Sequence, residues 1–252
     1  MSVTALPDCR VDIAAAGGVG ELAAVLARDG VALFDGVRTE RQLRQLANRL
    51  GRLVPHRDST HSGLTVITDR RNARTPAGQG GFSRHALAVH TDCSNLPRPP
   101  LLVAMTCVRP AERGGDCVLV DGHAIHDELA TIAPEALADL SARRGAYFGG
   151  AAGIVGNVFE PDPGGLVGIR LRRDELARFS PQTQRWLDLL TQIINRHTIT
   201  LPTRTGCGYV VNNRRWLHGR TAFTGPRTMY RALIEPLPAW RIPAGFAQAI
   251  AP

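Results

Sequence analysis

Short runs of β-prone residues, placed on both sides of a central helical stretch, constrain the fold of this chain most strongly. The clearest core strands are residues 101–108 and 117–120, and the proline and paired glycines between them predict a turn. Further short strands are predicted at residues 31–34, 64–68, 198–201, 209–212 and 228–234. Strands dispersed in this way favour an antiparallel, double-sheet barrel over a doubly wound parallel sheet.

Apolar residues at helical spacing predict helices before and between these strands. Residues 19–29 form one amphipathic helix, and Thr39 is expected to cap a second helix that stops at Gly51. Pro134 suits the first turn of a short helix, and the longest helix is predicted from residue 181 to about residue 196. The predicted architecture is mainly β, with N-terminal helices and a central helical insertion.

The composition is that of a globular protein. With 44% hydrophobic and 21% charged residues, the chain falls outside the disordered and collagen-like classes. Its 252 residues are consistent with a single domain over residues 1–252. No apolar run is long enough for a membrane span, residues 1–10 lack the features of a secretory signal, and the five scattered cysteines suggest reduced thiols. A cytoplasmic location and no membrane partner are therefore expected.

The formal charge of +8 raises the alternative of a non-enzymatic basic protein that binds nucleic acid. All 30 basic residues other than histidine are arginines, and they are spread along the whole chain. Aromatic residues make up only 5% of the chain, which is poor material for a base-stacking surface. A solvated basic surface without a nucleic-acid partner is the favoured interpretation.

A His-x-Asp pattern at His90 and Asp92 is the first candidate functional motif. On an extended backbone these two side chains project from the same face, because side chains alternate along a strand. A second histidine, His218, follows a later strand and precedes a glycine. Two histidines and one carboxylate leave three positions of a metal open, which suits non-haem Fe(II) that activates oxygen. By itself the pattern is weak, because such pairs arise often by chance.

Two arginines four residues apart, Arg227 and Arg231, form the second candidate motif. In a strand both would point to one face, and two cations that face a barrel interior need anionic partners. Arginine is suited to bidentate capture of a carboxylate. The alternative is a pair of structural salt bridges, for example with Glu235. The combination with the His-x-Asp pattern favours a functional role.

The order of these motifs resembles the Fe(II)/2-oxoglutarate dioxygenases of the TauD/TfdA and clavaminate-synthase-like type. The sequence has His-x-Asp, then a Gly-Gly-Asp turn into a strand, then a distal His-Gly-Arg and the paired arginines. Residues 90–122 and 212–231 carry the likeness, and the N-terminal helices with residues 30–34 are also similar. The resemblance implies a double-stranded β-helix, or jelly roll, and the use of Fe(II), 2-oxoglutarate and O₂.

The resemblance also implies roles for individual residues. His90, Asp92 and His218 would bind the iron, and Arg227 would hold the distal carboxylate of 2-oxoglutarate. In taurine-dioxygenase-like members a threonine after the Gly-Gly-Asp turn assists this arginine. Here that position is Cys117, which is a weaker hydrogen-bond partner.

The resemblance places the primary substrate near Arg231, which would take a carboxylate or another anion of the substrate. Phe82 and Arg84 are expected to line the substrate entrance, as is His85. They follow a polar stretch, residues 69–83, whose glycines and lack of periodicity predict a mobile loop.

Other reactive side chains are assigned no role in catalysis. His56 and His61 lie near the polar stretch and are expected to be solvated. His123 and His126 are expected to lie on an exposed helix face, because no carboxylate or third histidine has a suitable spacing to them. Cys93 is expected to serve packing.

The expected reaction is oxidation, most simply hydroxylation, of a C–H bond in a small carboxylate-bearing substrate such as an amino acid or a natural-product intermediate. The presence of Asp92 disfavours halogenation, because halogenating relatives carry a small residue at that position. Desaturation, epoxidation or cyclisation of a substrate tethered to a carrier protein remains an alternative. The oligomeric state is not predicted.

Overall fold

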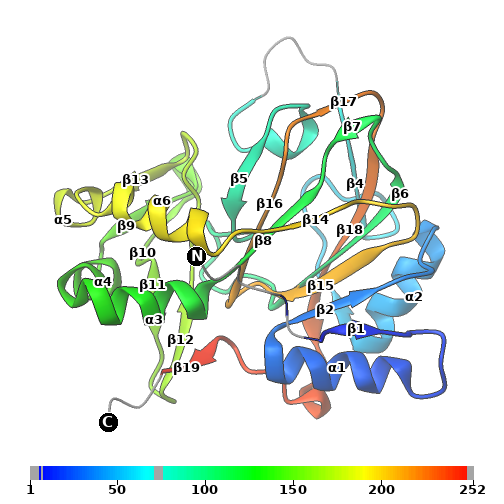
Figure 1. Ribbon diagram of the computed structural model, residues 1–252, viewed down its shortest axis with the longest axis horizontal. Helices are drawn as coiled ribbons and strands as arrows, with labels where there is room; N and C mark the ends of the chain where they lie inside the picture. The colour runs from blue at the N-terminus through cyan, green and yellow to red at the C-terminus, as the bar shows by residue number, and fades with distance from the viewer. Residues whose placement is uncertain (1–5, 7, 71–75, 249–252) are drawn as a thin grey trace.

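The computed structural model describes residues 6, 8–70 and 76–248 and contains two principal sheets (Figure 1). The larger sheet has the strand order β1-β2-β15-β6-β18-β3, and β4 also pairs with β18. Its strands are β1 (Arg10–Val11), β2 (Val31–Phe34), β3 (Gly51–Leu53), β4 (Thr65–Thr68), β6 (Leu102–Arg109), β15 (Gly208–Asn212) and β18 (Thr228–Pro236). All pairings in this sheet are antiparallel except that of β1 with β2.

The smaller principal sheet is antiparallel and has the order β14-β8-β16-β5. Its strands are β5 (Leu87–His90), β8 (Cys117–Asp121), β14 (Ile199–Leu201) and β16 (Trp216–Arg220). The contact between β16 and β5 is close at Gly219, where a Cβ atom would lie 2.6 Å from the carbonyl oxygen of Leu87. Glycine at this position therefore allows the two strands to approach.

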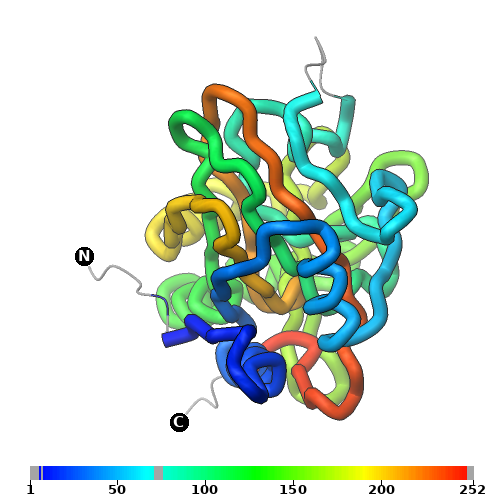
Figure 2. The backbone as a smooth tube through the Cα atoms, turned by 90° about the vertical axis from the view of Figure 1, so that its right-hand side faces the viewer, coloured from blue at the N-terminus to red at the C-terminus, as the bar shows by residue number. Residues whose placement is uncertain are grey.

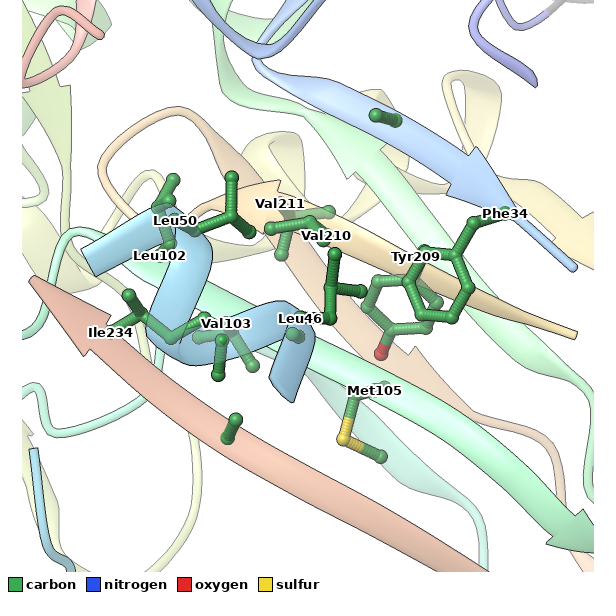
Figure 3. Close-up of a cluster of buried hydrophobic side chains, with 14 of the residues drawn as sticks. Phe34, Leu46, Leu50, Leu102, Val103, Met105, Tyr209, Val210, Val211 and Ile234 are labelled. Atoms are coloured by element: carbon green, nitrogen blue, oxygen red, sulfur yellow. The ribbon is translucent and has the colours of Figure 1, made fainter. Parts of the chain in front are cut away.

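One buried apolar cluster joins the two principal sheets. Leu119 and Trp216 of the smaller sheet belong to the same cluster as Leu102 and Tyr209 of the larger sheet. The two sheets therefore face each other across a shared core. Figure 3 shows side chains of this cluster that come from the larger sheet, among them Leu102, Val103 and Tyr209.

Two N-terminal helices cover the outer face of the larger sheet (Figure 1). They are α1 (Gly18–Asp29) and α2 (Glu40–Leu50). The predicted N-cap of α2 is confirmed as a capping box, in which Thr39 and Gln42 exchange hydrogen bonds between side chain and backbone. Leu46 and Leu50 of α2 pack on the sheet (Figure 3), and α2 lies beside β18 (Figure 2).

Residues 122–198 form a helical and sheet-containing layer outside the smaller principal sheet (Figure 1). The helices are α3 (Gly122–Ile132), α4 (Pro134–Ser141), α5 (Pro181–Gln184) and α6 (Leu187–Arg196). The strands are β9 (Ala146–Phe148), β10 (Ile154–Gly156), β11 (Phe159–Pro161), β12 (Leu166–Ile169) and β13 (Ala177–Phe179), and β19 (Phe246–Ala247) adds to β12. A second buried cluster packs this layer against Val120 and Leu217 of the smaller sheet.

Three single 3₁₀ turns and a small two-stranded antiparallel sheet complete the described elements. They are η1 (Gly80–Phe82), η2 (Gly150–Ala152), η3 (Pro238–Trp240), β7 (Arg113–Gly114) and β17 (Phe223–Thr224).

The prediction of a mainly β chain with helices is confirmed, and the ends of the predicted strands agree to within two residues. The prediction of one long helix over residues 181–196 is wrong. The helix is broken between α5 and α6, where Trp186 Nε1 and Arg185 both donate to the carboxylate of Asp139. Among the helices in the part of the chain that the structure describes, none is long and apolar enough to cross a membrane.

His123 and His126 do not form the exposed face that the sequence predicted. His126 is buried, with its ring 5.3 Å from that of Phe159 and 5.6 Å from that of Phe246. His123 stacks on Phe246 with the ring centroids 4.9 Å apart. Both histidines therefore pack β19 onto α3.

Candidate active site

A cavity of about 700 Å³ lies between the two principal sheets and opens to solvent. The smaller sheet contributes His90, His218 and Cys117 to its wall, and the larger sheet contributes Met105 and Tyr209. The cavity therefore brings together side chains from strands that are far apart in the sequence.

Three potential metal ligands meet in this cavity. One nitrogen of His90, one nitrogen of His218 and one carboxylate oxygen of Asp92 all lie within 4.8 Å of one another. The strand register explains part of this arrangement, because His218 of β16 is paired with His90 of β5 and their ring centroids are 4.6 Å apart. Asp92 lies in the turn that follows β5, two residues beyond its last residue.

Asn213 holds the backbone of Asp92 in place. Its Oδ1 accepts a hydrogen bond from the Asp92 amide at 2.8 Å, and its Nδ2 donates to the carbonyl oxygens of Asp92 and Pro100, each at 3.0 Å. Asn213 is completely buried. The sequence interpretation gave this residue no role.

The two oxygens of the Asp92 carboxylate have different environments. Arg231 Nη1 donates to Oδ1 at 2.8 Å, whereas Oδ2 is buried without a hydrogen-bond partner among the described residues. Oδ2 lies 3.6 Å from His218 Nε2. One oxygen is therefore fixed by the arginine, and the other remains available for a cation.

The protonation states of these groups suit a metal site. Burial would raise the pKa of Asp92, but Arg231 together with His218, His90 and His56 outweighs burial and lowers the pKa to about 2. Burial lowers the pKa of His218 to about 3 and also lowers that of His90. At neutral pH the site thus holds two neutral imidazoles and one carboxylate, which are the forms that bind a metal. His90 Nδ1 lies 3.0 Å from the Ala88 carbonyl, which fixes the ring and leaves Nε2 for a metal.

Arg227 lies in the same cavity and has no acidic partner within ion-pair distance among the described residues. The residue is 2% exposed, and its Nε donates to the carbonyl oxygen of Gly115 at 3.0 Å. Gly115 has a φ of 74°, and a Cβ there would lie 2.9 Å from Arg227 Cδ, so this turn needs glycine. The guanidinium is free to bind an anion.

Cys117 lines the cavity on the strand that follows this turn. Burial raises the pKa of its thiol to about 11, although the charge of Arg227 acts in the opposite direction. The thiol is therefore neutral at physiological pH and is at most a weak hydrogen-bond partner.

The model of the family described as "Taurine catabolism dioxygenase TauD, TfdA family" matches residues 9–233. The chain belongs to the TauD/TfdA family. Membership confirms the resemblance inferred from the motifs and, together with the His90, Asp92 and His218 cluster, identifies a dioxygenase that uses iron, 2-oxoglutarate and O₂. A comparison with curated proteins finds no match.

Solved structures with a similar fold include two oxygenases in complex with hydroxylated amino acids. Asparagine oxygenase in complex with Fe(II), 2S,3S-3-hydroxyasparagine and succinate is 15% identical, with a TM-score of 0.68, over 94% of this chain and 86% of that chain. The non-haem iron oxygenase OrfP with Fe, succinate and (3S)-hydroxy-L-Arg is 14% identical, with a TM-score of 0.70, over 93% and 87% of the two chains. At this identity the likeness concerns the fold.

Of the residues that were expected to line the substrate entrance, only some lie in the cavity wall of this TauD/TfdA family member. Phe82 is buried in the cavity wall, and His85 also lines the cavity. Arg84 is exposed, pairs with Asp69 at 2.6 Å and is absent from the described cavity wall. Within residues 69–83, the stretch 71–75 lies outside the described residues.

The structure adds residues that sequence reasoning missed. His56 was expected to be solvated, but it lines the cavity, where burial and then Arg231 lower the pKa of its imidazole. Arg172 and Asp174 form an ion pair and also line the cavity. Their signal in the sequence was a charged run, Arg-Arg-Asp-Glu, in a segment without periodicity.

Proposed function

We propose that this protein is an Fe(II)- and 2-oxoglutarate-dependent dioxygenase that hydroxylates a C–H bond of a small carboxylate-bearing substrate, such as an amino acid. The observation that carries the proposal is the free carboxylate oxygen of Asp92 between two neutral imidazoles, in one cavity with Arg227 and Arg231. The two principal sheets would form the double-stranded β-helix, residues 122–198 its helical insertion, and residues 1–252 a single domain.

His90, Asp92 and His218 would bind the iron through three protein atoms, which leaves the remaining positions for cosubstrate and oxygen. Iron, 2-oxoglutarate and O₂ together supply the oxidising power, and the protein supplies position and environment. Asn213 and Arg231 hold Asp92 by its backbone and by one oxygen. The ligand geometry is therefore set before the metal binds.

Arg227 would bind the distal carboxylate of 2-oxoglutarate. Its guanidinium is buried, has no acid within ion-pair distance among the residues described, and is fixed at Nε by Gly115. A buried cation of this kind is stabilised by a bidentate carboxylate. Cys117 would pack beside the cosubstrate, with at most a weak contact from its thiol.

Arg231 would take an anionic group of the primary substrate while it keeps its bond to Asp92. Only Nη1 is engaged with Asp92, Nη2 lies 3.5 Å from Thr65 Oγ1, and Nε is buried without a partner in the described part of the chain. His56 lies near Arg231, and Phe82 offers an apolar wall. The hydroxylated amino acids in the similar structures support an amino acid as the substrate class.

Three further predictions stay open. Desaturation, epoxidation or cyclisation of a carrier-tethered substrate would use the same ligands, and no feature of the cavity favours it. The absence of a nucleic-acid partner and a cytoplasmic location also remain predictions. All five cysteines are free thiols in the structure.

The test is aerobic incubation with Fe(II), 2-oxoglutarate and single amino acids, with succinate and the mass of the amino acid followed together. We expect one class of amino acid to gain a single oxygen atom in step with succinate formation. Asp92→Ala should abolish both signals, and Arg84→Gln is the matched surface control. Equal succinate formation by the wild type and Asp92→Ala would contradict the proposal.

A further inference from the structure

Arg220 is a buried arginine for which the proposed function gives no role. It is the last residue of β16, is 5% exposed and contributes to the cavity wall. Its guanidinium donates to three carbonyl oxygens: Nη1 to Gly81 at 3.0 Å, and Nη2 to Ser83 at 2.8 Å and His85 at 2.6 Å. No carboxylate of the described residues lies within ion-pair distance of it.

The three carbonyls belong to residues 80–87, which we call the covering segment. It forms one wall of the cavity and carries Phe82, yet it contains only the single turn η1 before β5 begins. Alternate carbonyls of the segment, at residues 81, 83 and 85, converge on the one guanidinium. Arg220 is therefore the side chain that holds the covering segment at several points.

Arg220 is also a neighbour of the candidate anion site. The guanidinium carbons of Arg220 and Arg227 lie 4.8 and 5.7 Å from the centroid of the same ring, that of Phe223. Arg220 Nε is buried without a hydrogen-bond partner among the described residues. Two buried cations beside one aromatic ring repel each other until an anion is present.

We propose that Arg220 is a positioning residue that couples anion binding at Arg227 to the placement of the covering segment. The inference rests on the proposed function, in which the anion is the distal carboxylate of 2-oxoglutarate. The carboxylate would offset the repulsion between the two guanidiniums and so favour the arrangement in which Arg220 holds the three carbonyls. Cosubstrate binding would thereby complete the wall against which the primary substrate packs.

The experiment is hydrogen exchange, measured by mass spectrometry, of the full-length protein with Zn(II), with and without 2-oxoglutarate. The wild type should exchange the amides of residues 80–87 roughly tenfold more slowly when 2-oxoglutarate is present. Arg220→Gln should exchange this segment faster without ligand and should lose the ligand-dependent protection. Arg220→Lys keeps the cation but cannot reach three carbonyls at once, so it should bind 2-oxoglutarate and still lose the protection.

Arg170 provides a matched control. It is also buried and donates to backbone carbonyls, those of Ser94, Leu96 and Pro97, and it pairs in addition with Glu160. Arg170→Gln should speed exchange at residues 94–97 and leave the protection of residues 80–87 intact. If the role of Arg220 were purely structural, 2-oxoglutarate would protect residues 80–87 in Arg220→Gln as it does in Arg170→Gln.

The outcomes separate this inference from the proposed function. Protection of residues 80–87 by 2-oxoglutarate in Arg220→Lys or Arg220→Gln, as in the wild type, would overturn the coupling. If Arg220→Gln does not fold, the protection of residues 80–87 by 2-oxoglutarate in Arg220→Lys alone tests the coupling. Failure of the wild type to bind 2-oxoglutarate in a calorimetric titration would overturn the proposed function instead. Arg227→Gln should lose binding of 2-oxoglutarate. Because it also removes the repulsion between the two guanidiniums, it should slow the unliganded exchange of residues 80–87, and adding 2-oxoglutarate should cause no further change.

Discussion

Arg231 donates a hydrogen bond from Nη1 to Oδ1 of Asp92 at 2.8 Å and leaves Oδ2 of the same carboxylate without a partner in the described part of the chain. Sequence reasoning assigned Arg231 to the substrate and considered a salt bridge, for example with Glu235, as the alternative. The structure contains an ion pair, but with the candidate metal ligand. Arg231 therefore fixes the orientation of Asp92 in addition to facing the cavity.

We expect Arg231→Gln to weaken metal binding roughly 10- to 100-fold, the range observed when a partner of a metal ligand is lost. The affinity is measured by calorimetric titration of the metal-free protein with Mn(II). The Mn(II) affinity of Arg231→Lys should lie between those of the wild type and Arg231→Gln. A lysine can pair with the carboxylate but cannot fix it with a planar guanidinium. Arg84→Gln changes an exposed arginine outside the described cavity wall and should bind Mn(II) as the wild type does. Wild-type affinity in Arg231→Gln would contradict the positioning role.

Arg227→Gln should raise the Kd for 2-oxoglutarate roughly 100-fold, because charged hydrogen bonds to the distal carboxylate are lost. The same substitution removes a buried cation that has no carboxylate within ion-pair distance among the described residues, so the thermal stability of the unliganded protein should not fall. Calorimetry with 2-oxoglutarate and a melting curve without it measure the two effects. A structural arginine would show the opposite pattern, with a large loss of stability and an unchanged Kd.

Cys117→Ser tests the departure of this chain from the threonine of its relatives. A hydroxyl of nearly the same volume is a stronger hydrogen-bond donor than the thiol, so the Kd for 2-oxoglutarate should fall about fivefold. Cys107→Ser is the control, because Cys107 is also buried but does not line the cavity. An unchanged Kd in Cys117→Ser would place this side chain out of reach of the cosubstrate.

His126 should make the stability of the metal-free protein depend on pH. Burial between Phe159 and Phe246 lowers the pKa of His126, against a smaller opposing effect of Asp127. Below the unfolded pKa of about 6.5 the unfolded chain binds more protons than the folded one, so the free energy of unfolding falls as the pH decreases from 7 to 5. His126→Phe should flatten this dependence in urea titrations, whereas His61→Gln should not. An equal slope in His126→Phe and the wild type would exclude this contribution.

The parts of the site that the sequence predicted are those that short motifs carry. His90 and Asp92 are two residues apart, and His218 lies next to a glycine that a close strand pair needs. The expected reason was wrong for Asp92, because this residue lies in the turn after β5 and not on an extended strand with His90. Asn213 and Arg220 act through contacts with segments more than 100 residues earlier in the chain. No local pattern records such contacts, and the sequence could not distinguish these side chains from other buried polar residues.

Two physical reasons explain the errors in the fold. Residues 181–196 have the apolar period of one helix, but Asp139 of another helix accepts from both Arg185 and Trp186 and ends α5 early. The strands β9–β13 have three or four residues each, which is too short for a detectable alternation. A tertiary contact thus determined the first outcome, and the shortness of the strands determined the second.

Gly219→Ala should damage the metal site without changing any ligand. A Cβ at this position would lie 2.6 Å from the Leu87 carbonyl oxygen and 3.1 Å from Val89 Cα, both of which are backbone atoms of β5. The strand that carries His90 would have to move away from the strand that carries His218, so Mn(II) affinity and thermal stability should fall together. Gly20→Ala is the matched control, because Gly20 lies in α1, a Cβ there would meet nothing within 4 Å, and alanine should stabilise the helix by about 1 kcal/mol. Wild-type Mn(II) affinity in Gly219→Ala would mean that β5 can shift without displacing His90. The close pairing of β5 with β16 would then not determine the distance between His90 and His218.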